Sequence, residues 1–251
     1  CLNSEYFCQR IYRNLSLVYL ISDFQVGSFK IGLLRSKWIN ALSKPEIIDI
    51  THDIHLNNTI EAAFVEKQIQ YPENVNVITL IKVGEQKSSI VYQHSDRLYI
   101  LPNNGLISML FDQPNISEAY IIDSLNETEA AHLYLNNQLN KLEKAGSRLV
   151  LRYPKQVQFT GQICVTEVIY ADKHGNCYFN LKQEQFRDFV AGKAFTAKIQ
   201  HYVGFNFEAI QEHVSDVNPG DPVLRFSSSG YLKLQINQGN AKQLFRIKED
   251  T

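Results

Sequence analysis

The chain has 251 residues and a mass of 28.8 kDa, which is enough for one large or two ordinary domains. With 25 Lys and Arg against 26 Asp and Glu, its net charge of −1 argues against a nucleic-acid or other polyanion binder. Its 44% apolar and 20% charged residues exclude a disordered chain, and no apolar run approaches the roughly 18 residues of a membrane span.

The four cysteines, Cys1, Cys8, Cys164 and Cys177, are too few and too scattered for a disulfide framework, and they form no C-x-x-C pair. We therefore expect reduced thiols and a cytoplasmic protein. The first residue is Cys1 rather than Met, which fits a processed end or a cloning remnant. A lipid-modified cysteine is a third possibility.

Strand and helix patterns alternate over the first 150 residues. Short apolar runs rich in β-branched residues predict buried strands, apolar residues at helical spacing predict helices, and residues 88–94 and 97–101 are typical of a hairpin. The other predicted strands are 17–21, 46–50, 75–83 and 119–122, and the predicted helices are 28–42, 58–71, 105–111 and 127–145. This order predicts an α/β domain at 15–150 with a mostly parallel sheet, preceded by an N-terminal extension at 1–14.

After about residue 152 the apolar runs become shorter and alternate with polar residues, and glycine turns separate them. The predicted strands are 162–170, 177–181, 195–203, 222–226 and 231–236. Strands at this spacing predict an all-β domain at 155–251, a small barrel or sandwich, joined to the first domain near residues 147–155.

Common nucleotide and hydrolase motifs are missing. The loop at 23–28 lacks the glycines of a G-x-G-x-x-G dinucleotide loop, and it has no Walker Lys-Ser/Thr pair. The chain also has no G-x-S-x-G nucleophile elbow. These absences argue against NAD enzymes, P-loop NTPases and standard serine hydrolases.

Polar residues follow the first two predicted strands. Asp23 comes at the carboxyl end of the first, where open α/β sheets bind ligands. A carboxylate there can accept both hydroxyls of a ribose, and a helix N-cap or an ordinary loop acid fits the spacing equally well. His52, Asp53 and His55 follow the second strand and could hold a metal or simply form a loop. Polar turns are also predicted at 102–105, 172–176 and 227–230.

Five segments in this order resemble the S-adenosylmethionine (SAM) hydroxide adenosyltransferase family, which includes the fluorinases and chlorinases. Each segment is short, but five in register from about 17 to 241 are specific. The segments are 21–24 (ISDF), 48–54 (IDITHDI) with 61–64 (EAAF), 101–106 (LPNNGL), 171–176 (ADKHGN), and 228–232 (SSGYL) with 237–241 (NQGNA).

The resemblance implies an N-terminal α/β domain, a C-terminal β domain, and a homotrimer that binds SAM between the first domain of one subunit and the second domain of a neighbour. By position, Asp23 would hold the ribose hydroxyls and Asn176 would face the adenine edge. Asp172 and Ser228 would contact the amino-acid end of the methionine moiety. Further loop contacts are implied for Phe24, Thr51, His52 and Asn104.

Family chemistry is displacement at the ribose 5′ carbon by water or a halide, with methionine as leaving group. The enzyme mainly places the nucleophile in line and removes its solvent. For water, the family pattern has an Asp, an Arg and a His near the nucleophile. Aligned on Gly84, this chain has Leu80 and Lys87 at the Asp and Arg positions, and residues 117–126 contain no His. Lys87 keeps the charge and is our catalytic candidate, and Glu85 or His132 could stand in.

The ligand positions therefore match the family better than the catalytic positions do. The leading hypothesis is a protein that binds SAM or adenosine and hydrolyses SAM to adenosine and L-methionine. The alternative is a catalytically impaired member acting as a nucleoside sensor or scaffold trimer, and a third is an enzyme with another nucleophile or nucleoside. No metal or further cofactor is expected, because SAM itself is the substrate or ligand.

Overall fold

The computed structural model describes residues 16–84, 87–123, 126–153, 155–200, 202 and 204–247. The chain divides into two compact units, Cys1–Tyr153 and Pro154–Thr251, and each is described by itself below. The predicted extension at 1–14 lies outside the described residues. In the described part of the chain, no helix is long and apolar enough to cross a membrane.

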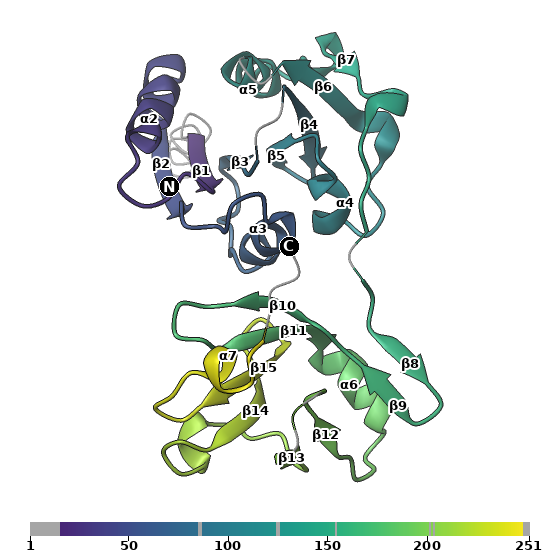
Figure 1. The fold of residues 1–251 in the computed structure, drawn as a ribbon. Coiled ribbons are helices and arrows are strands. Elements are labelled where there is room, and N and C mark those ends of the chain that lie inside the picture. The colour runs from purple at the N-terminus through teal and green to yellow at the C-terminus, as the bar shows by residue number, and fades with distance from the viewer. Residues whose placement is uncertain are drawn as a thin grey trace, which may run out of the picture. The chain divides into compact units, whose positions relative to one another are not determined.

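The first unit is built on a seven-stranded sheet with the order β2-β1-β3-β5-β4-β6-β7 (Figure 1). Strands β2, β1, β3 and β5 pair parallel, as expected, whereas β4 pairs antiparallel with both β5 and β6, and β7 pairs antiparallel with β6. The carboxyl ends of the parallel strands therefore lie along one edge. The strands are β1 (Ser16–Ser22), β2 (Glu46–Thr51), β3 (Asn76–Lys82), β4 (Ser88–His94), β5 (Arg97–Pro102), β6 (Ala119–Asp123) and β7 (Glu143–Lys144).

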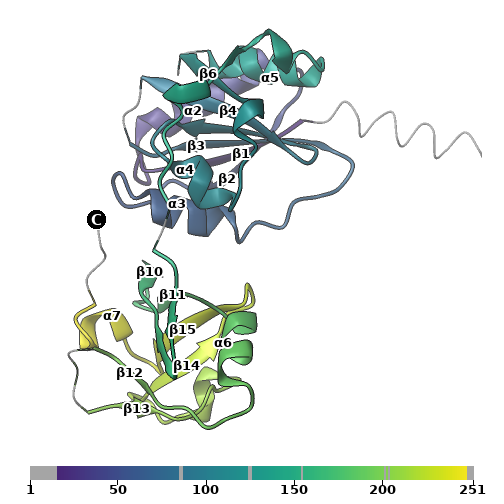
Figure 2. The ribbon, with the colours of Figure 1, turned by 90° about the vertical axis from the view of Figure 1, so that its right-hand side faces the viewer.

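Helices cover both faces of this sheet (Figure 2). On one face, α2 (Phe29–Ala41) and α5 (Glu127–Leu135) pack side chains such as Trp38 and Ala130 against Leu20 and Leu80. On the other, α3 (Thr59–Glu66) and α4 (Leu106–Leu110) pack against β1 and β3. Each fully buried aliphatic side chain contributes about 1.5–3 kcal/mol. Short 3-10 turns are η1 (Ile116–Glu118), η2 (Leu139–Lys141) and η3 (Gly146–Arg148).

In the described part of the second unit, the main sheet is antiparallel with the order β10-β11-β15-β14, beside the two-stranded sheets β8-β9 and β12-β13. Cys177, Leu224 and Leu234 face its apolar core. The strands are β8 (Gln158–Thr160), β9 (Ile163–Val165), β10 (Val168–Ala171), β11 (Cys177–Lys182), β12 (Ala197–Lys198), β13 (Asn206–Phe207), β14 (Pro222–Phe226) and β15 (Tyr231–Ile236). The helices are α6 (Gln183–Val190), η4 (Val214–Asp216) and α7 (Ala241–Leu244).

The predicted α/β unit followed by a β-rich unit is therefore confirmed, with separate sheets in the second unit rather than one barrel. The predicted strand 162–170 is two strands, β9 and β10, and β12 covers only part of the predicted strand 195–203. Residues 201 and 203 lie outside the described residues. The sequence reading missed α6, whose Phe186, Phe189 and Val190 have the helical spacing that could have indicated it.

The predicted helix 127–145 is wrong beyond Leu135. The Asn136 Nδ2 donates to the His132 carbonyl (2.8 Å), and Asn137 follows with a left-handed φ of +56°. Asparagine side chains compete with helical hydrogen bonds in this way, and asparagine tolerates the left-handed region. The chain then forms η2 and β7, which pairs with β6. The predicted helix 58–71 similarly ends at Glu66.

A buried carboxyl group lies at the end of α3. The Tyr71 hydroxyl donates to Glu66 Oε1 (3.0 Å) and lies 3.0 Å from Thr79 Oγ1. Burial raises the pKa of Glu66, and the hydrogen bonds from Tyr71 and Tyr99 and the charge of Arg97 only partly oppose this rise. The folded state therefore favours the protonated carboxyl group.

We expect the free energy of unfolding of Glu66→Gln to increase relative to that of wild type as pH rises. The pKa of Glu66 is raised in the folded state, so in wild type this residue stabilises the folded state fully below its unfolded pKa of about 4.3. That stabilisation is lost as pH rises through the folded pKa. Each unit of elevation corresponds to about 1.4 kcal/mol, and the amide oxygen of Gln can still accept a tyrosine hydrogen bond. Urea unfolding at pH 5 and pH 8 measures the change. Exposed Glu73→Gln is the control, and a pH-independent difference for Glu66→Gln would contradict the expectation.

Candidate functional site

The loops that follow β1, β2, β3 and β5 lie at one edge of the sheet and are tied to each other. The Gln25 amide donates to the His52 carbonyl (2.7 Å), and the Ile54 amide donates to the Ser22 carbonyl (3.3 Å). Asn104 Nδ2 donates to the Val83 carbonyl (3.1 Å). This edge is where open α/β sheets bind ligands.

Asp23 lies at this edge, as the sequence predicts. Its Oδ2 accepts hydrogen bonds from the amides of Asn57 (3.1 Å) and Gly84 (2.8 Å), so one oxygen joins three loops. Gly84 has a φ of +79°, a left-handed conformation that favours glycine, and a Cβ there would come 2.8 Å from Asn57 Oδ1. Within the described residues, Asp23 Oδ1 accepts no hydrogen bond, and the side chain is half-buried.

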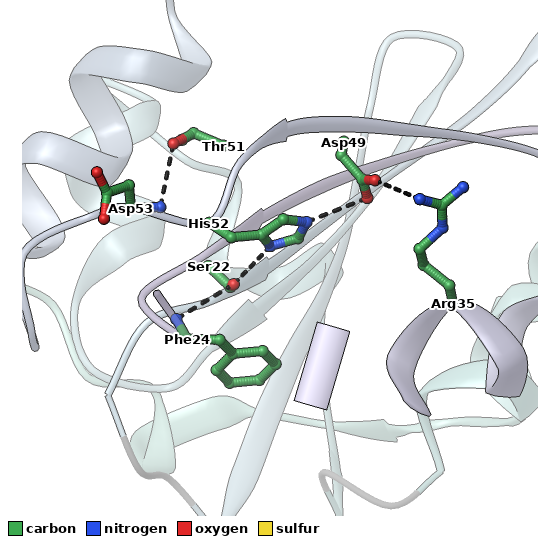
Figure 3. A network of polar contacts seen from close by, with 7 residues as sticks. All are labelled: Ser22, Phe24, Arg35, Asp49, Thr51, His52 and Asp53. Atoms are coloured by element: carbon green, nitrogen blue, oxygen red, sulfur yellow. Dashed lines mark hydrogen bonds and ion pairs between the residues drawn. The ribbon is translucent and has the colours of Figure 1, made fainter. Parts of the chain in front are cut away.

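A polar network centred on buried Ser22 and His52 links the end of β1 to Asp49 and Arg35 (Figure 3). Ser22 Oγ is 2.7 Å from His52 Nδ1 and accepts a long hydrogen bond (3.4 Å) from the Phe24 amide. His52 Nε2 lies 3.1 Å from Asp49 Oδ1, close enough for an ion pair although not aligned as a hydrogen bond. Asp49 Oδ2 in turn accepts from Arg35 (2.8 Å).

This Ser–His–Asp order resembles a nucleophilic triad, but its serine is fully buried. Ser22 Oγ carries one proton and two lone pairs, so it accepts from the Phe24 amide and still has both a donor and an acceptor site for His52 Nδ1, 2.7 Å away. The network therefore fixes the loop that carries Asp23 and Phe24. His52 acts through this loop rather than by facing solvent.

The other predicted loop residues also have partners at this edge. Thr51 Oγ1 accepts from the Asp53 amide (3.1 Å), and Asn104 Oδ1 accepts from the Leu106 amide (3.3 Å). The Phe24 ring packs against the core under α2 and α5, with Lys30 Nζ 5.7 Å from its centroid. These residues lie near Asp23, and direct ligand contact by each stays a prediction.

The two histidines of the possible metal segment have different partners. His55 Nδ1 and its backbone amide both lie 2.8 Å from Glu61 Oε2, which ties the loop to the start of α3. His52 belongs to the network of Ser22 and Asp49. Over the described ranges, no group of three or more His, Cys, Asp or Glu side chains could hold a metal ion.

The residues at the family's catalytic positions lie in very different environments. Leu80 is fully buried in β3, paired with Leu20 and Ile100, so its side chain belongs to the core. Lys87 is exposed just before β4. His132 is exposed on α5, and Glu85 lies outside the described residues.

Sequence reasoning missed a charge cluster at the end of β3. Glu127, the first residue of α5, is almost completely buried and lies 2.6 Å from Lys82 Nζ and 3.5 Å from Lys37 Nζ. Ser89 Oγ donates to it at 3.4 Å. The lysine that ends the apolar strand 76–82 was the available signal, because a partly buried lysine needs an acidic partner.

In the second unit, Asp172 organises the turn between β10 and β11. Its Oδ1 accepts from the amides of His174 and Asn176 (both 3.0 Å), and its Oδ2 accepts from Asn176 Nδ2 (2.8 Å). Asn176 Oδ1 accepts from Gln235 Nε2 (3.0 Å). Ser228 is exposed in the hairpin turn between β14 and β15.

Two segments that are far apart in the sequence meet at Gly175. Its φ is +79°, and a Cβ there would overlap the side-chain amide of Asn240. Asn240 Oδ1 caps α7 by accepting from the Gln243 amide (2.8 Å), and the Lys242 amide donates to the Gly175 carbonyl (2.9 Å). This contact explains why the 171–176 and 237–241 segments need their glycine and asparagine.

Known proteins resemble both units. The SAM hydroxide adenosyltransferase N-terminal domain matches residues 18–141, and the corresponding C-terminal domain matches 166–251. A fluorinase of Actinopolyspora mzabensis is 26% identical over 174 residues, which is 61% of this chain but only 58% of that protein. The (R)-S-adenosyl-L-methionine hydrolase of Thermus thermophilus is 21% identical over 258 aligned residues, covering 92% of this chain and 96% of that protein.

Solved structures share the fold. An uncharacterized conserved protein from Thermotoga maritima has a TM-score of 0.76 and 19% identity, covering 94% of this chain and 97% of its own. A conserved hypothetical protein from Thermus thermophilus has a TM-score of 0.71 and 20% identity, with 93% and 97% covered. Because both family domains match in order over most of its length, this chain belongs to the SAM hydroxide adenosyltransferase family.

Proposed function

We propose that this protein binds SAM or adenosine and hydrolyses SAM to adenosine and L-methionine. The observation that carries the proposal is Asp23, whose carboxylate lies at the ligand-binding edge of the sheet with one oxygen fixed by two backbone amides. The other oxygen is then held in place to accept a ribose hydroxyl. Family membership supplies the substrate class.

In the proposed reaction, a water oxygen forms a bond to the ribose 5′ carbon while the carbon–sulfur bond breaks. The electron pair of that bond stays on the methionine sulfur and neutralises the sulfonium, and the water proton goes to solvent. Because the leaving group is already activated, the protein mainly has to position the reactants and exclude competing solvent. Buried Leu80 cannot orient the water, so we assign a supporting electrostatic role to the exposed charge of Lys87.

The proposal places Phe24, Thr51 and Asn104 around the nucleoside and gives buried His52 the role of holding the loop that carries Asp23. Asp172, Asn176 and Ser228 would contribute from the second unit of a neighbouring subunit. We also propose that the chain assembles into a homotrimer. Support for self-association comes from exposed apolar side chains on the two loops that are hydrogen-bonded beside Asp23 and on the start of α2, because clustered apolar exposure is typical of interfaces. These side chains are Val26, Phe29, Leu33 and Leu56.

The direct test is incubation of the purified protein with SAM in ¹⁸O-labelled water. We expect equimolar adenosine and methionine, with one ¹⁸O atom in the adenosine 5′ hydroxyl. Calorimetry with adenosine measures binding separately. Binding without product would favour the nucleoside-sensor alternative. The burial of Leu80 is the observation in favour of that alternative, because a buried leucine cannot orient a water molecule. A 5′-halo product in halide buffer would instead identify a halide nucleophile, and absence of both binding and product would contradict the proposal.

A further inference from the structure

The charge cluster at the end of β3 lies at the same edge of the sheet as Asp23. β5 is parallel to β3, β4 is antiparallel to β5, and β6 is antiparallel to β4, so β6 runs in the same direction as β3. The chain therefore leaves β6 at the edge where open α/β sheets bind ligands, and α5 begins there with Glu127. The reaction proposed above gives this buried carboxylate no role.

Glu127 joins four elements through one carboxylate. Its Oε1 accepts hydrogen bonds from Lys82 Nζ of β3 (2.6 Å) and from Ser89 Oγ of β4 (3.4 Å), and its Oε2 lies 3.5 Å from Lys37 Nζ of α2. The side chain of Glu127 is only 2% exposed, and that of Lys82 is 26% exposed. Among the described residues, Lys82 Nζ donates to no other acceptor. Glu127 therefore determines where the Lys82 side chain lies.

The main chain of Lys82 is bonded directly to Asp23. The Asp23 amide donates to the Lys82 carbonyl (3.1 Å), and Asp23 Oδ2 accepts from the Gly84 amide (2.8 Å). Asp23 thus contacts residues 82–84 with its backbone at one end and with its carboxylate at the other. A displacement of the end of β3 would consequently displace the carboxylate of Asp23.

Stability alone is a poor explanation for the Lys82–Glu127 pair. The free energy of taking two charges out of water offsets much of their attraction, and apolar side chains of similar size often stabilise a protein equally well. Neutralising Glu127 alone is different, because it would leave the partly buried ammonium group of Lys82 without a carboxylate. Lys82 would then turn toward solvent, and the end of β3 would lose its fixed position beside Asp23.

We propose that Glu127 is a positioning residue for the ribose contact, because it holds the end of β3 through Lys82 and thereby holds Asp23. This inference rests on the proposed function, in which Asp23 accepts a ribose hydroxyl. Glu127 itself touches no ligand in this arrangement. Its effect on binding is therefore confined to ligands that carry the hydroxyls that Asp23 accepts.

The test compares adenosine with 2′,3′-dideoxyadenosine, which lacks both ribose hydroxyls. By calorimetry we expect wild type to prefer adenosine by at least about tenfold, because hydrogen bonds to a charged group are among the strongest. Glu127→Gln should lower adenosine affinity about tenfold and change dideoxyadenosine affinity by less than about twofold. Glu129→Gln, an exposed glutamate in the same first turn of α5, is the matched control and should change neither affinity.

The outcomes separate this inference from the proposed function. If wild type binds neither nucleoside, or binds both equally, the ribose contact of the proposed function fails. If wild type prefers adenosine but Glu127→Gln keeps that preference, or loses both ligands to the same extent, the role of Glu127 is overturned while the ribose contact stands. Should Glu127→Gln not fold, Lys82→Gln carries the same expectation, because it breaks the same pair and leaves Glu127 the charge of Lys37.

Discussion

Replacing Asp23 by alanine is expected to weaken adenosine binding by about 100-fold. The variant removes the carboxylate that we propose accepts a ribose hydroxyl, and hydrogen bonds to a charged group contribute about 1.5–3 kcal/mol. It also leaves the amides of Asn57 and Gly84 without their common acceptor. The loops would then have to be ordered when the ligand binds, which adds to the loss. Calorimetry with adenosine measures the change.

Asp53→Ala is the matched control for this prediction. Asp53 is an exposed aspartate on the neighbouring loop, and the structure uses its backbone amide, not its carboxylate, to bond Thr51. We expect its affinity for adenosine to stay within about threefold of wild type, since surface charges contribute little. Unchanged affinity in Asp23→Ala, with wild type binding normally, would show that Asp23 does not contact the nucleoside.

A second large effect is expected in the second unit, where Gly175→Ala should lower the free energy of unfolding by about 3 kcal/mol. A left-handed φ costs an alanine about 1–2 kcal/mol. The new methyl group would also displace the Asn240 side chain, and the loss of its cap on α7 costs about 1 kcal/mol more. Urea unfolding followed by circular dichroism measures the sum.

Gly192→Ala separates these two causes. Gly192 has nearly the same φ, +77°, but a Cβ there would meet nothing within 4 Å. Replacing Gly192 by alanine should therefore lower the free energy of unfolding only by the cost of the left-handed backbone, about 1–2 kcal/mol. In an Asn240→Ala background, Gly175→Ala should cost about as much as Gly192→Ala, because the overlapping amide is gone. Equal costs for Gly175→Ala and Gly192→Ala in the wild-type background would contradict a role for Asn240.

The sequence predicted best the strands that are buried on both faces of the sheet, because all their side chains have the same apolar surroundings. The strands at 16–22 and 76–82 are nearly continuous apolar runs because both faces of the sheet are covered. Helix lengths were less predictable, because the apolar spacing of 127–145 continues past the point where Asn136 and Asn137 end α5. There the local hydrogen-bonding preference of asparagine outweighs the apolar pattern.

The position of Asp23 could be predicted because it depends on strand order alone. Its partners could not, since Asn57 and Gly84 lie 34 and 61 residues further along the chain. For the same reason, the sequence did not predict the Lys82–Glu127 pair or the contact of Asn176 with Gln235, which is 59 residues away. Such pairs depend on tertiary packing, which residue types and spacing do not specify.

The burial of Leu80 also bears on how this sequence could evolve. An aspartate at this position would place a carboxylate between Leu20 and Ile100 in the middle of the sheet. A carboxyl group buried there without a partner would be protonated rather than charged, and burying it without a hydrogen bond costs roughly 2–7 kcal/mol, a large part of the roughly 5–15 kcal/mol by which a typical domain is stable. A single change of Leu80 to the aspartate of the family pattern is therefore expected to destabilise the first unit rather than to restore the family's site.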